Sequence, residues 1–164
     1  MPVSTTHVFC LCAPVSRKAL QGLLENDGRG TYRDTHPWLV AKEMFTAARE
    51  AGKRLPILFA TTDSATFSHW AFVEALEVVE LHRATWESAL TFSPLKPVNP
   101  IWEPLDSLLL MPNEAQLRRE SLEGIHQHRY PLTNGELHPY AICETPAFIE
   151  AESRLPGDAP SSTA

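Results

Sequence analysis

Flat aromatic side chains are the first residues of this sequence that could do chemistry. The 164-residue chain contains four tryptophans, and two of them, Trp38 and Trp70, open segments of regular pattern. Together with Phe72 they can wall a pocket for a flat ligand, such as a nucleobase turned out of its stack. Packing in the interior is the alternative for the same three side chains.

A short glycine-containing segment, Gly28-Arg-Gly-Thr-Tyr-Arg33, is the second candidate. Arg29 and Arg33 can clamp a phosphate from such a loop, because a guanidinium group matches the geometry of phosphate oxygens. The segment lacks the residues of a Walker loop, and Arg33 stands where a dinucleotide-binding loop has its third glycine. These two kinds of nucleotide chemistry are therefore not expected, and an ordinary surface loop is the alternative.

A third candidate is the segment His126-Gln-His-Arg-Tyr130. Arg129 can contact a phosphate or a base edge, and Tyr130 can stack on a base. Basic residues after a helix can also simply complement its dipole. The sequence thus predicts a binding site of aromatic and basic side chains, comprising Trp38, Trp70, Phe72, Arg29, Arg33, Arg129 and Tyr130.

The spacing of the cysteines raises the question of a metal site. Cys10 and Cys12 are two residues apart, so on a strand both thiols point to the same face, and His126 and His128 could complete the ligand set. Structural zinc sites more often place two to four residues between their cysteines. Core packing is therefore the favoured interpretation, and neither a metal nor a cofactor is expected.

Composition and charge exclude several classes of protein. No run of about 18 apolar residues is present, so no membrane association is expected. Three cysteines fit reduced thiols and a cytoplasmic location better than a disulfide scaffold. The net charge is −6, with a basic first third and an acidic remainder. This balance argues against a protein that coats duplex nucleic acid through phosphates alone.

Hydrophobic periodicity divides the chain into short strands and helices. Ser16 is a good N-cap, and Gly52 is a good helix terminator. Asn113 can cap a further helix in which Leu122 faces inward. We predict strands at 7–13, 55–60 and 140–143, and helices at 16–25, 35–52 and 114–125.

The segment 67–90 permits two interpretations. As a helix it carries an apolar stripe, and as strands it places Trp70, Phe72, Leu76 and Val78 on one face. The strand interpretation leaves Glu74 to be explained by edge exposure or a bulge. We favour strands.

The middle of the chain resembles the small PUA-like barrels shared by the ASCH, EVE and SRA groups. Three segments carry the resemblance over residues 37–145: Lys53-Arg-Leu-Pro-Ile-Leu-Phe-Ala60, the aromatic-led segment 67–81, and a late Tyr-Ala-Ile-Cys strand. The resemblance implies a cleft that binds RNA, or DNA with a modified or flipped base. ASCH proteins carry Gly-x-Lys-x-x-Glu-x-Arg, but Gly28-Arg-Gly-Thr-Tyr-Arg33 lacks the Lys and the Glu, so no catalytic residue is carried over.

The expected fold is therefore α+β, a small bent or barrel-like sheet with about three packed helices, and the alternative is a three-layer α/β domain. We expect one globular domain over residues 1–147 and a disordered tail over 148–164. The expected function is a nucleic-acid-binding module that reads RNA or DNA. Two alternatives are a small hydrolase of nucleosides or nucleic acids, with Cys143 or His69 as the reactive group, and a protein-interaction domain.

Overall fold

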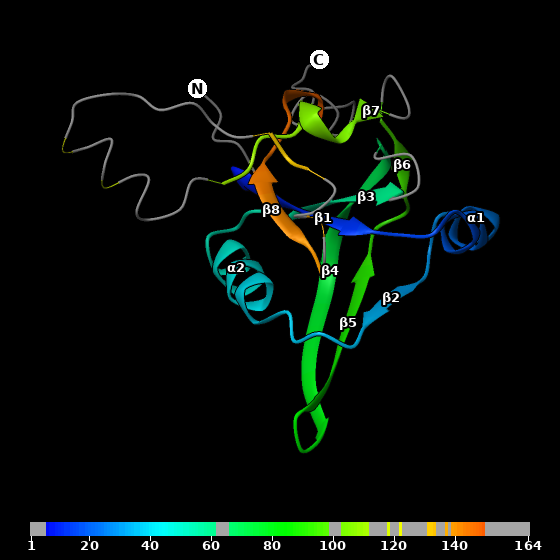
Figure 1. The fold of residues 1–164 in the computed structure, drawn as a ribbon, viewed down its shortest axis with the longest axis vertical. Helices are drawn as coiled ribbons and strands as arrows, with labels where there is room; N and C mark the ends of the chain where they lie inside the picture. Colours follow the sequence, from blue (N-terminus) through cyan, green and yellow to red (C-terminus); the bar gives the residue numbers. More distant parts are fainter. Residues whose placement is uncertain are drawn as a thin grey trace, which may run out of the picture.

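The computed structural model describes residues 6–61, 66–98, 103–111 and 139–149, with residues 118, 122, 131–133 and 137 between them. The described part is a mixed α+β fold built mainly from strands (Figure 1). The elements in chain order are β1 (Phe9–Pro14), α1 (Arg17–Glu25), β2 (Thr31–Asp34), α2 (Leu39–Glu50), β3 (Pro56–Thr61), β4 (Thr66–His82), β5 (Thr85–Phe92), β6 (Lys96–Pro97), β7 (Glu103–Pro104), the 3-10 turn η1 (Leu105–Ser107) and β8 (Ala141–Glu144).

One sheet organises these elements, with the strand order β2-β5-β4-β3-β1-β8 and with β6 and β7 also paired to β4. β1 and β3 run parallel, and the other pairs are antiparallel. Among the described residues β2 and β8 do not pair with each other, so the sheet is bent but not closed into a barrel. The α+β class predicted from sequence is confirmed, and the three-layer alternative with a helix over 67–90 is wrong.

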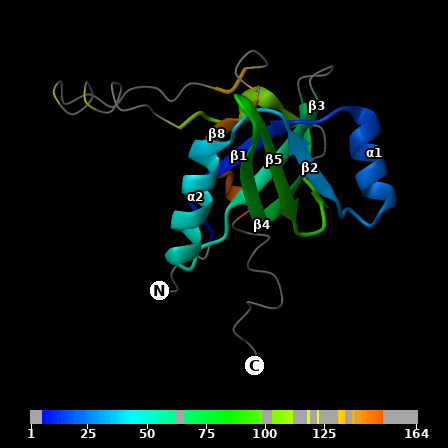
Figure 2. The ribbon, with the colours of Figure 1, turned by 90° about the horizontal axis from the view of Figure 1, so that it is seen from below.

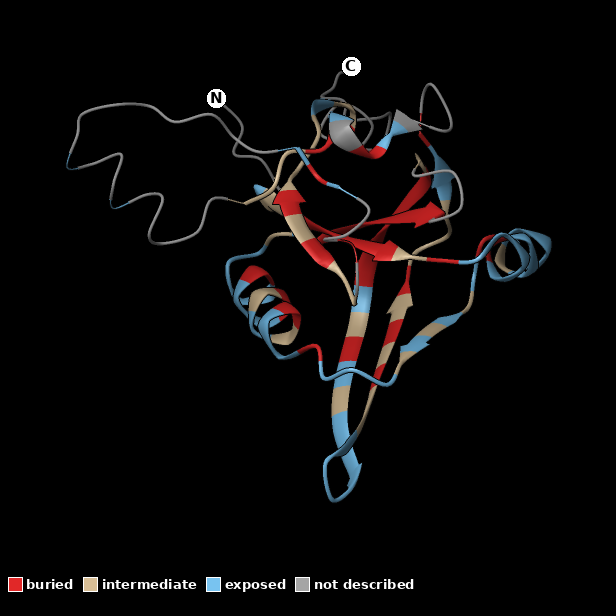
Figure 3. Ribbon diagram, viewed as in Figure 1, coloured by how far each residue is buried: buried red, intermediate tan, exposed pale blue. Residues whose placement is uncertain are grey.

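The long strand β4 holds the sheet together. Its first half pairs with β3 through Phe72, and its second half pairs with β5. The β4–β5 hairpin projects from the body of the molecule, and its tip is exposed (Figure 3). Ala84 turns the tip with a φ of 59°.

A register shift lies between Val73 and Ala75, where Glu74 is exposed. The shift moves Leu76 to the same side as Val73, and both are buried with Leu90. The sequence prediction that Leu76 shares a face with Trp70 is therefore wrong. A bulge adds one residue to a strand and so reverses the alternation beyond it.

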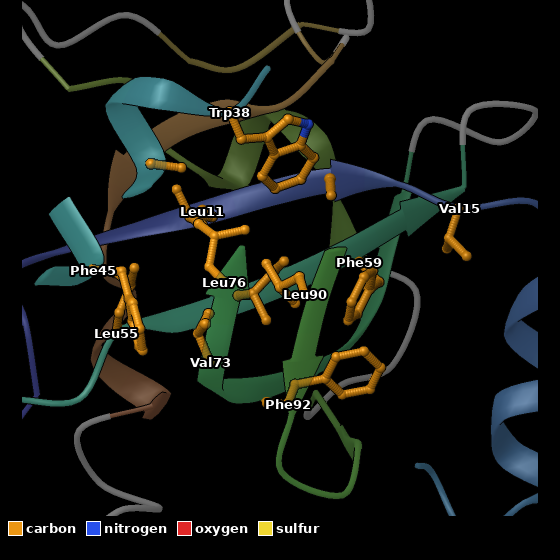
Figure 4. Packing of buried hydrophobic residues seen from close by; sticks show 14 of the residues in the cluster. Leu11, Val15, Trp38, Phe45, Leu55, Phe59, Val73, Leu76, Leu90 and Phe92 are labelled. Carbon is orange, nitrogen blue, oxygen red and sulfur yellow. The ribbon is translucent and has the colours of Figure 1, made fainter. Parts of the chain in front are cut away.

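The strands alternate between two buried clusters, one on each face of the sheet. In β3, Ile57 and Phe59 point to one face and Leu58 and Ala60 to the other. We call the side of Phe59 the first cluster; it contains Leu11, Trp38, Phe45, Ala71, Leu76 and Phe92 (Figure 4). The second cluster, on the side of Leu58, contains Cys10, Cys12, Trp70, Phe72, Leu105, Leu132 and Cys143.

In Figure 2, α1 and α2 lie on either side of the strands, and both contribute buried residues to the first cluster. α2 buries Ala41, Phe45 and Ala48. It begins at Leu39, four residues after the predicted start. Ser88 holds the preceding segment in place, since its hydroxyl donates to the His36 carbonyl at 2.6 Å and accepts from the Trp38 amide at 3.0 Å. Helical backbone is also disfavoured at His36, because the ring of a proline clashes with the residue before it.

Several sequence predictions fall at or beyond the limits of the described residues. Leu122, predicted to face inward, is 82% exposed, and most of the remaining 114–125 helix lies outside the described part. Ile149 is fully buried and Phe148 packs against the second cluster, so these two residues, expected to begin the tail, contact the core. Residues 150–164 lie outside the described part. No helix in the described ranges is long and apolar enough to span a bilayer.

Candidate functional site

A hollow of about 280 Å³ lies where β1 ends, α1 begins and β2 passes beside them. We call it the α1 hollow. Its wall combines apolar side chains with hydroxyl groups and one guanidinium group. The lining residues are Pro14, Val15, Ser16, Ala19, Leu23, Thr31, Tyr32 and Arg33.

The start of α1 is fixed by local chemistry. The Val15 amide donates to the Ala60 carbonyl at 2.8 Å, which ties the end of β1 to β3. Ser16 then takes extended backbone, and its hydroxyl accepts from the Ala19 amide at 3.0 Å. This cap satisfies one of the unpaired amides of a helix N-terminus and leaves the positive end of the helix dipole beside the hollow.

The turn after α1 brings β2 back to form the opposite wall. Gly28 has a φ of +74°, and a Cβ there would lie 2.7 Å from the Leu95 amide nitrogen. Glycine is therefore required for the chain to turn so close to the segment after β5. The Leu95 amide donates to the Gly28 carbonyl at 3.0 Å and fixes this approach.

Tyr32 forms the rigid part of the wall. Its hydroxyl donates to the Pro14 carbonyl at 2.6 Å, and its ring lies 5.6 Å from Phe59 and 5.7 Å from Trp38, between centroids. Burial, and then the nearby Asp34 charge, raise the pKa of Tyr32 above its ordinary value. The hydroxyl therefore keeps its proton and its bond to Pro14 at all physiological pH values.

One basic residue, Arg33, lines the α1 hollow, and two more lie in the adjoining first turn of α1. Arg33 is 60% exposed at its side chain, and its Nη1 lies 3.2 Å from Glu87 Oε2 on β5. Arg17 and Lys18 occupy the first turn of α1, which holds no acidic residue. Cations at a helix N-terminus oppose the dipole and cost about 0.3–1 kcal/mol each. The arrangement is thus unfavourable for the helix but favourable for an anion.

Trp38, predicted to stack on a ligand, is 1% exposed in the first cluster. Its Nε1 donates to Asp34 Oδ2 at 2.7 Å, and its ring lies 4.3 Å from that of Tyr140. Figure 4 shows it directed inward with Leu11 and Leu76. As it stands, this ring packs in the core and offers no face to a ligand.

Trp70 and Phe72 lie on the other face of the sheet, in the second cluster, where they are 0% and 8% exposed. Their rings meet edge to face with centroids 5.1 Å apart. The structure therefore brings these two predicted residues together but separates them from Trp38.

The predicted basic residues are only partly described. Arg33 lines the α1 hollow, and Arg29 is exposed in the turn between α1 and β2. Arg129 and Tyr130 lie outside the described residues, as do His126 and His128. Sequence reasoning did not select Ser16 and Tyr32 for the site, although the N-cap pattern of Ser16 was recognised. A tyrosine directly before an arginine in a strand does not by itself indicate a binding site.

The three cysteines are free thiols with no exposed surface. Cys10 and Cys143 are directly opposite each other on β1 and β8. Burial, and then the charge of Cys143, raise the pKa values of Cys10 and Cys12, so these thiols are poor nucleophiles. Within the described ranges no group of three or more His, Cys, Asp or Glu residues is arranged to hold a metal ion.

Ser68 and His69 form a buried polar pair on β4. Ser68 Oγ lies 2.8 Å from His69 Nδ1, and the two residues are 0% and 6% exposed. Burial lowers the pKa of His69, so the imidazole is neutral at pH 7 and can accept the hydroxyl proton.

No protein-family model matches the sequence, and a search of curated proteins finds no relative.

Proposed function

We propose that this protein is a nucleic-acid-binding module with a PUA-like architecture, and that the α1 hollow receives a phosphate group of the RNA or DNA. The observation that carries the proposal is a guanidinium group in the wall of a defined concavity beside a helix N-terminus. Arg33 and the N-cap residue Ser16 both line the hollow, and Arg17 and Lys18 follow Ser16 in the first helical turn. Backbone amides at a helix N-terminus add neutral donors of the kind that bind phosphate.

The size and lining of the hollow favour a local contact over a long groove. About 280 Å³ is close to the lower limit for small-molecule sites, about 300 Å³. The apolar lining of Val15, Ala19 and Leu23 fits the carbon atoms of a sugar better than a second phosphate. Few phosphate contacts also agree with the overall charge of −6.

The test is fluorescence anisotropy with short labelled RNA and DNA, single- and double-stranded, with and without base modifications, at low and physiological salt. A site with about one phosphate contact gives a shallow salt slope, near −0.7 on logarithmic axes for a single strand. Absence of binding to every oligonucleotide would overturn the proposal.

The ion pair on β2 and β5 supplies matched variants. Arg33→Ala removes a charged donor and should weaken binding about 10-fold or more. Glu87→Gln removes the carboxylate that competes for the same guanidinium, and should leave binding unchanged or tighter. Both side chains are exposed, so neither change should affect folding by more than about 0.5 kcal/mol. Equal affinities for the two variants would place the site elsewhere.

A small hydrolase is the second candidate, and the Ser68–His69 pair is the observation that favours it. A serine hydroxyl 2.8 Å from a neutral imidazole is the nucleophile–base arrangement of hydrolases. Hydrolysis of a panel of nucleotide esters should then be lost in both Ser68→Ala and His69→Gln. Loss in only one of the two variants, or no hydrolysis in the wild type, would exclude this pair as the catalytic group.

A further inference from the structure

The indole nitrogen of Trp70 is an unusual polar atom in the described part of the chain. Trp70 is fully buried, and its Nε1 has no hydrogen-bond partner. A buried tryptophan N–H normally finds an acceptor, because leaving it unpaired costs about 1–3 kcal/mol. Trp38 follows the normal rule, since its Nε1 donates to Asp34 at 2.7 Å.

Two cations flank the aromatic pair to which this nitrogen belongs. Lys96 Nζ lies 5.3 Å from the centroid of the Trp70 ring, and the Arg54 guanidinium carbon lies 4.1 Å from that of Phe72. Both Lys96 and Arg54 are exposed residues. The ring that carries the buried, unpaired donor is therefore contacted by one exposed cation, and the neighbouring Phe72 ring by another.

The backbone fixes these neighbours in position. Lys96 is the direct partner of Trp70 in the β4–β6 ladder. On the other side of β4, the Val73 amide donates to the Leu55 carbonyl at 2.8 Å, which places the segment before β3 next to Phe72. The cluster thus comes from three separate parts of the chain and does not depend on one flexible loop.

The chemistry of this cluster selects a ligand that accepts hydrogen bonds and carries negative charge. A neutral N–H donor gives direction, and the Lys96 ammonium group beside the same ring supplies positive charge. We infer that Trp70 Nε1 and Lys96 form a second binding site, which takes the phosphate group of a small phosphorylated molecule.

Entry to this site passes through Lys96. Its exposed, flexible side chain lies over the ring, where the cation–π contact is worth only about 0.5–1 kcal/mol at an exposed position. A bound phosphate replaces this contact with a stronger charge-assisted one. Lys96 then moves from the ring to the ligand.

This second site is separate from the α1 hollow. Trp70 belongs to the second cluster, whereas Tyr32, which walls the hollow, packs against the first. The two proposals can therefore fail independently. Substitution of Arg33 tests the hollow, and substitution of Trp70 or Lys96 tests the second site.

The test is the indole N–H region of a ¹H–¹⁵N correlation spectrum of the full chain. Trp→Phe substitutions at Trp38, Trp86 and Trp102 assign the signals, leaving Trp70 by elimination. Three probes are titrated: inorganic phosphate, a nucleoside 5′-monophosphate and the same nucleoside without phosphate. The Trp70 signal should move downfield and saturate with the first two probes, while the Trp38 signal, already hydrogen-bonded, stays in place.

Two variants and a matched control complete the test. Trp70→Phe and Lys96→Gln should each weaken phosphate binding about 10-fold or more, as expected for loss of a charge-assisted hydrogen bond. Arg49→Gln is the control, because Arg49 lies 5.5 Å from the Phe45 ring in the first cluster and should not affect binding. If Trp70→Phe does not fold, the shift in the wild-type protein and the Lys96→Gln variant still decide the question.

Three results would overturn the inference. The first is a Trp70 signal that moves with none of the probes. This result would indicate that the indole N–H of Trp70 donates to a buried water molecule and not to a ligand. The second is a uniform shift of all four indole signals, which would indicate nonspecific ion effects. The third is unchanged phosphate affinity in Lys96→Gln.

Discussion

The two faces of the sheet each bury a tryptophan, and they treat it differently. In the first cluster, Trp38 donates from its indole to Asp34 and from its amide to Ser88. In the second cluster, the indole nitrogen of Trp70 has no partner, and exposed cations lie over the aromatic rings. The first arrangement is complete without any other molecule, and the second is not.

This difference supports a stabilising role for Trp38 and agrees with the binding role inferred for Trp70. The two N–H donors of Trp38 tie the start of α2 to the sheet, because Asp34 ends β2 and Ser88 belongs to β5. Trp70 fills the core with its ring but retains an unused donor.

The largest expected effect concerns the thiols, which all lie in the second cluster. Cys10, Cys12 and Cys143 are fully buried, and burial raises the pKa values of the first two. Labelling by a thiol reagent at pH 8 should be at least about 1,000-fold slower in the native protein than in denaturant, because it needs opening of a core of ordinary stability. Rapid labelling of one cysteine would show that the second cluster opens independently of the first.

Removal of the Trp38 side chain should cause the next largest loss. Trp38→Ala deletes a fully buried ring and its bond to Asp34, which should lower the free energy of unfolding by about 3–5 kcal/mol. Urea denaturation followed by circular dichroism measures this value. A loss below about 1 kcal/mol would contradict the central role given to Trp38.

Trp→Phe substitutions compare the two clusters directly, because both remove an indole N–H and leave an aromatic ring. Trp38→Phe leaves Asp34 Oδ2 without its indole donor, whereas Trp70→Phe removes a donor that has no acceptor. Trp38→Phe should therefore be more destabilising, by about 1–3 kcal/mol. The reverse order in urea denaturation would refute the assignment of partners.

The smallest effect is on the pH dependence of stability, and it involves only the first cluster. Burial acts to raise the pKa of Asp34, but hydrogen bonds from Trp38 and His36 outweigh it and hold the pKa below its ordinary value. A lowered folded-state pKa stabilises the protein above the unfolded-state pKa, and this contribution is lost as pH falls through the folded-state value. Thermal melts should therefore show a loss of stability below about pH 4 that is smaller in Asp34→Asn and Trp38→Phe. Trp70→Phe should keep the wild-type profile.

Much of the architecture could be predicted because it depends on local patterns. The strand over Phe9–Pro14 and the cap at Ser16 follow from an apolar run and from one hydroxyl in the right place. The strand interpretation of 67–90 is also confirmed. The start of α2 was misplaced, because the Ser88 hydroxyl that holds His36 and Trp38 lies about 50 residues away in the sequence.

The candidate site was only partly accessible to sequence reasoning. Arg33 was selected for its charge and lines the α1 hollow. Trp38 and Trp70 were grouped because both open predicted elements, yet the sheet separates them. Lys96 and Arg54 gave no sequence signal as a pair, because the pairing of β4 with β6 and β3 brings Lys96 to the Trp70 ring and Arg54 to the adjacent Phe72 ring.

The sequence by itself determined the α+β class, most of the short elements and the turns between them, since capping, periodicity and glycine conformation act over a few residues. The tertiary structure alone decided which face of the sheet each residue joins. One bulge after Val73 moved Leu76 to the other cluster, because strand alternation has a period of two and a single added residue reverses it. The tertiary structure also decided which indole N–H is paired, because a hydrogen bond forms only where the fold places an acceptor within about 3 Å of the donor.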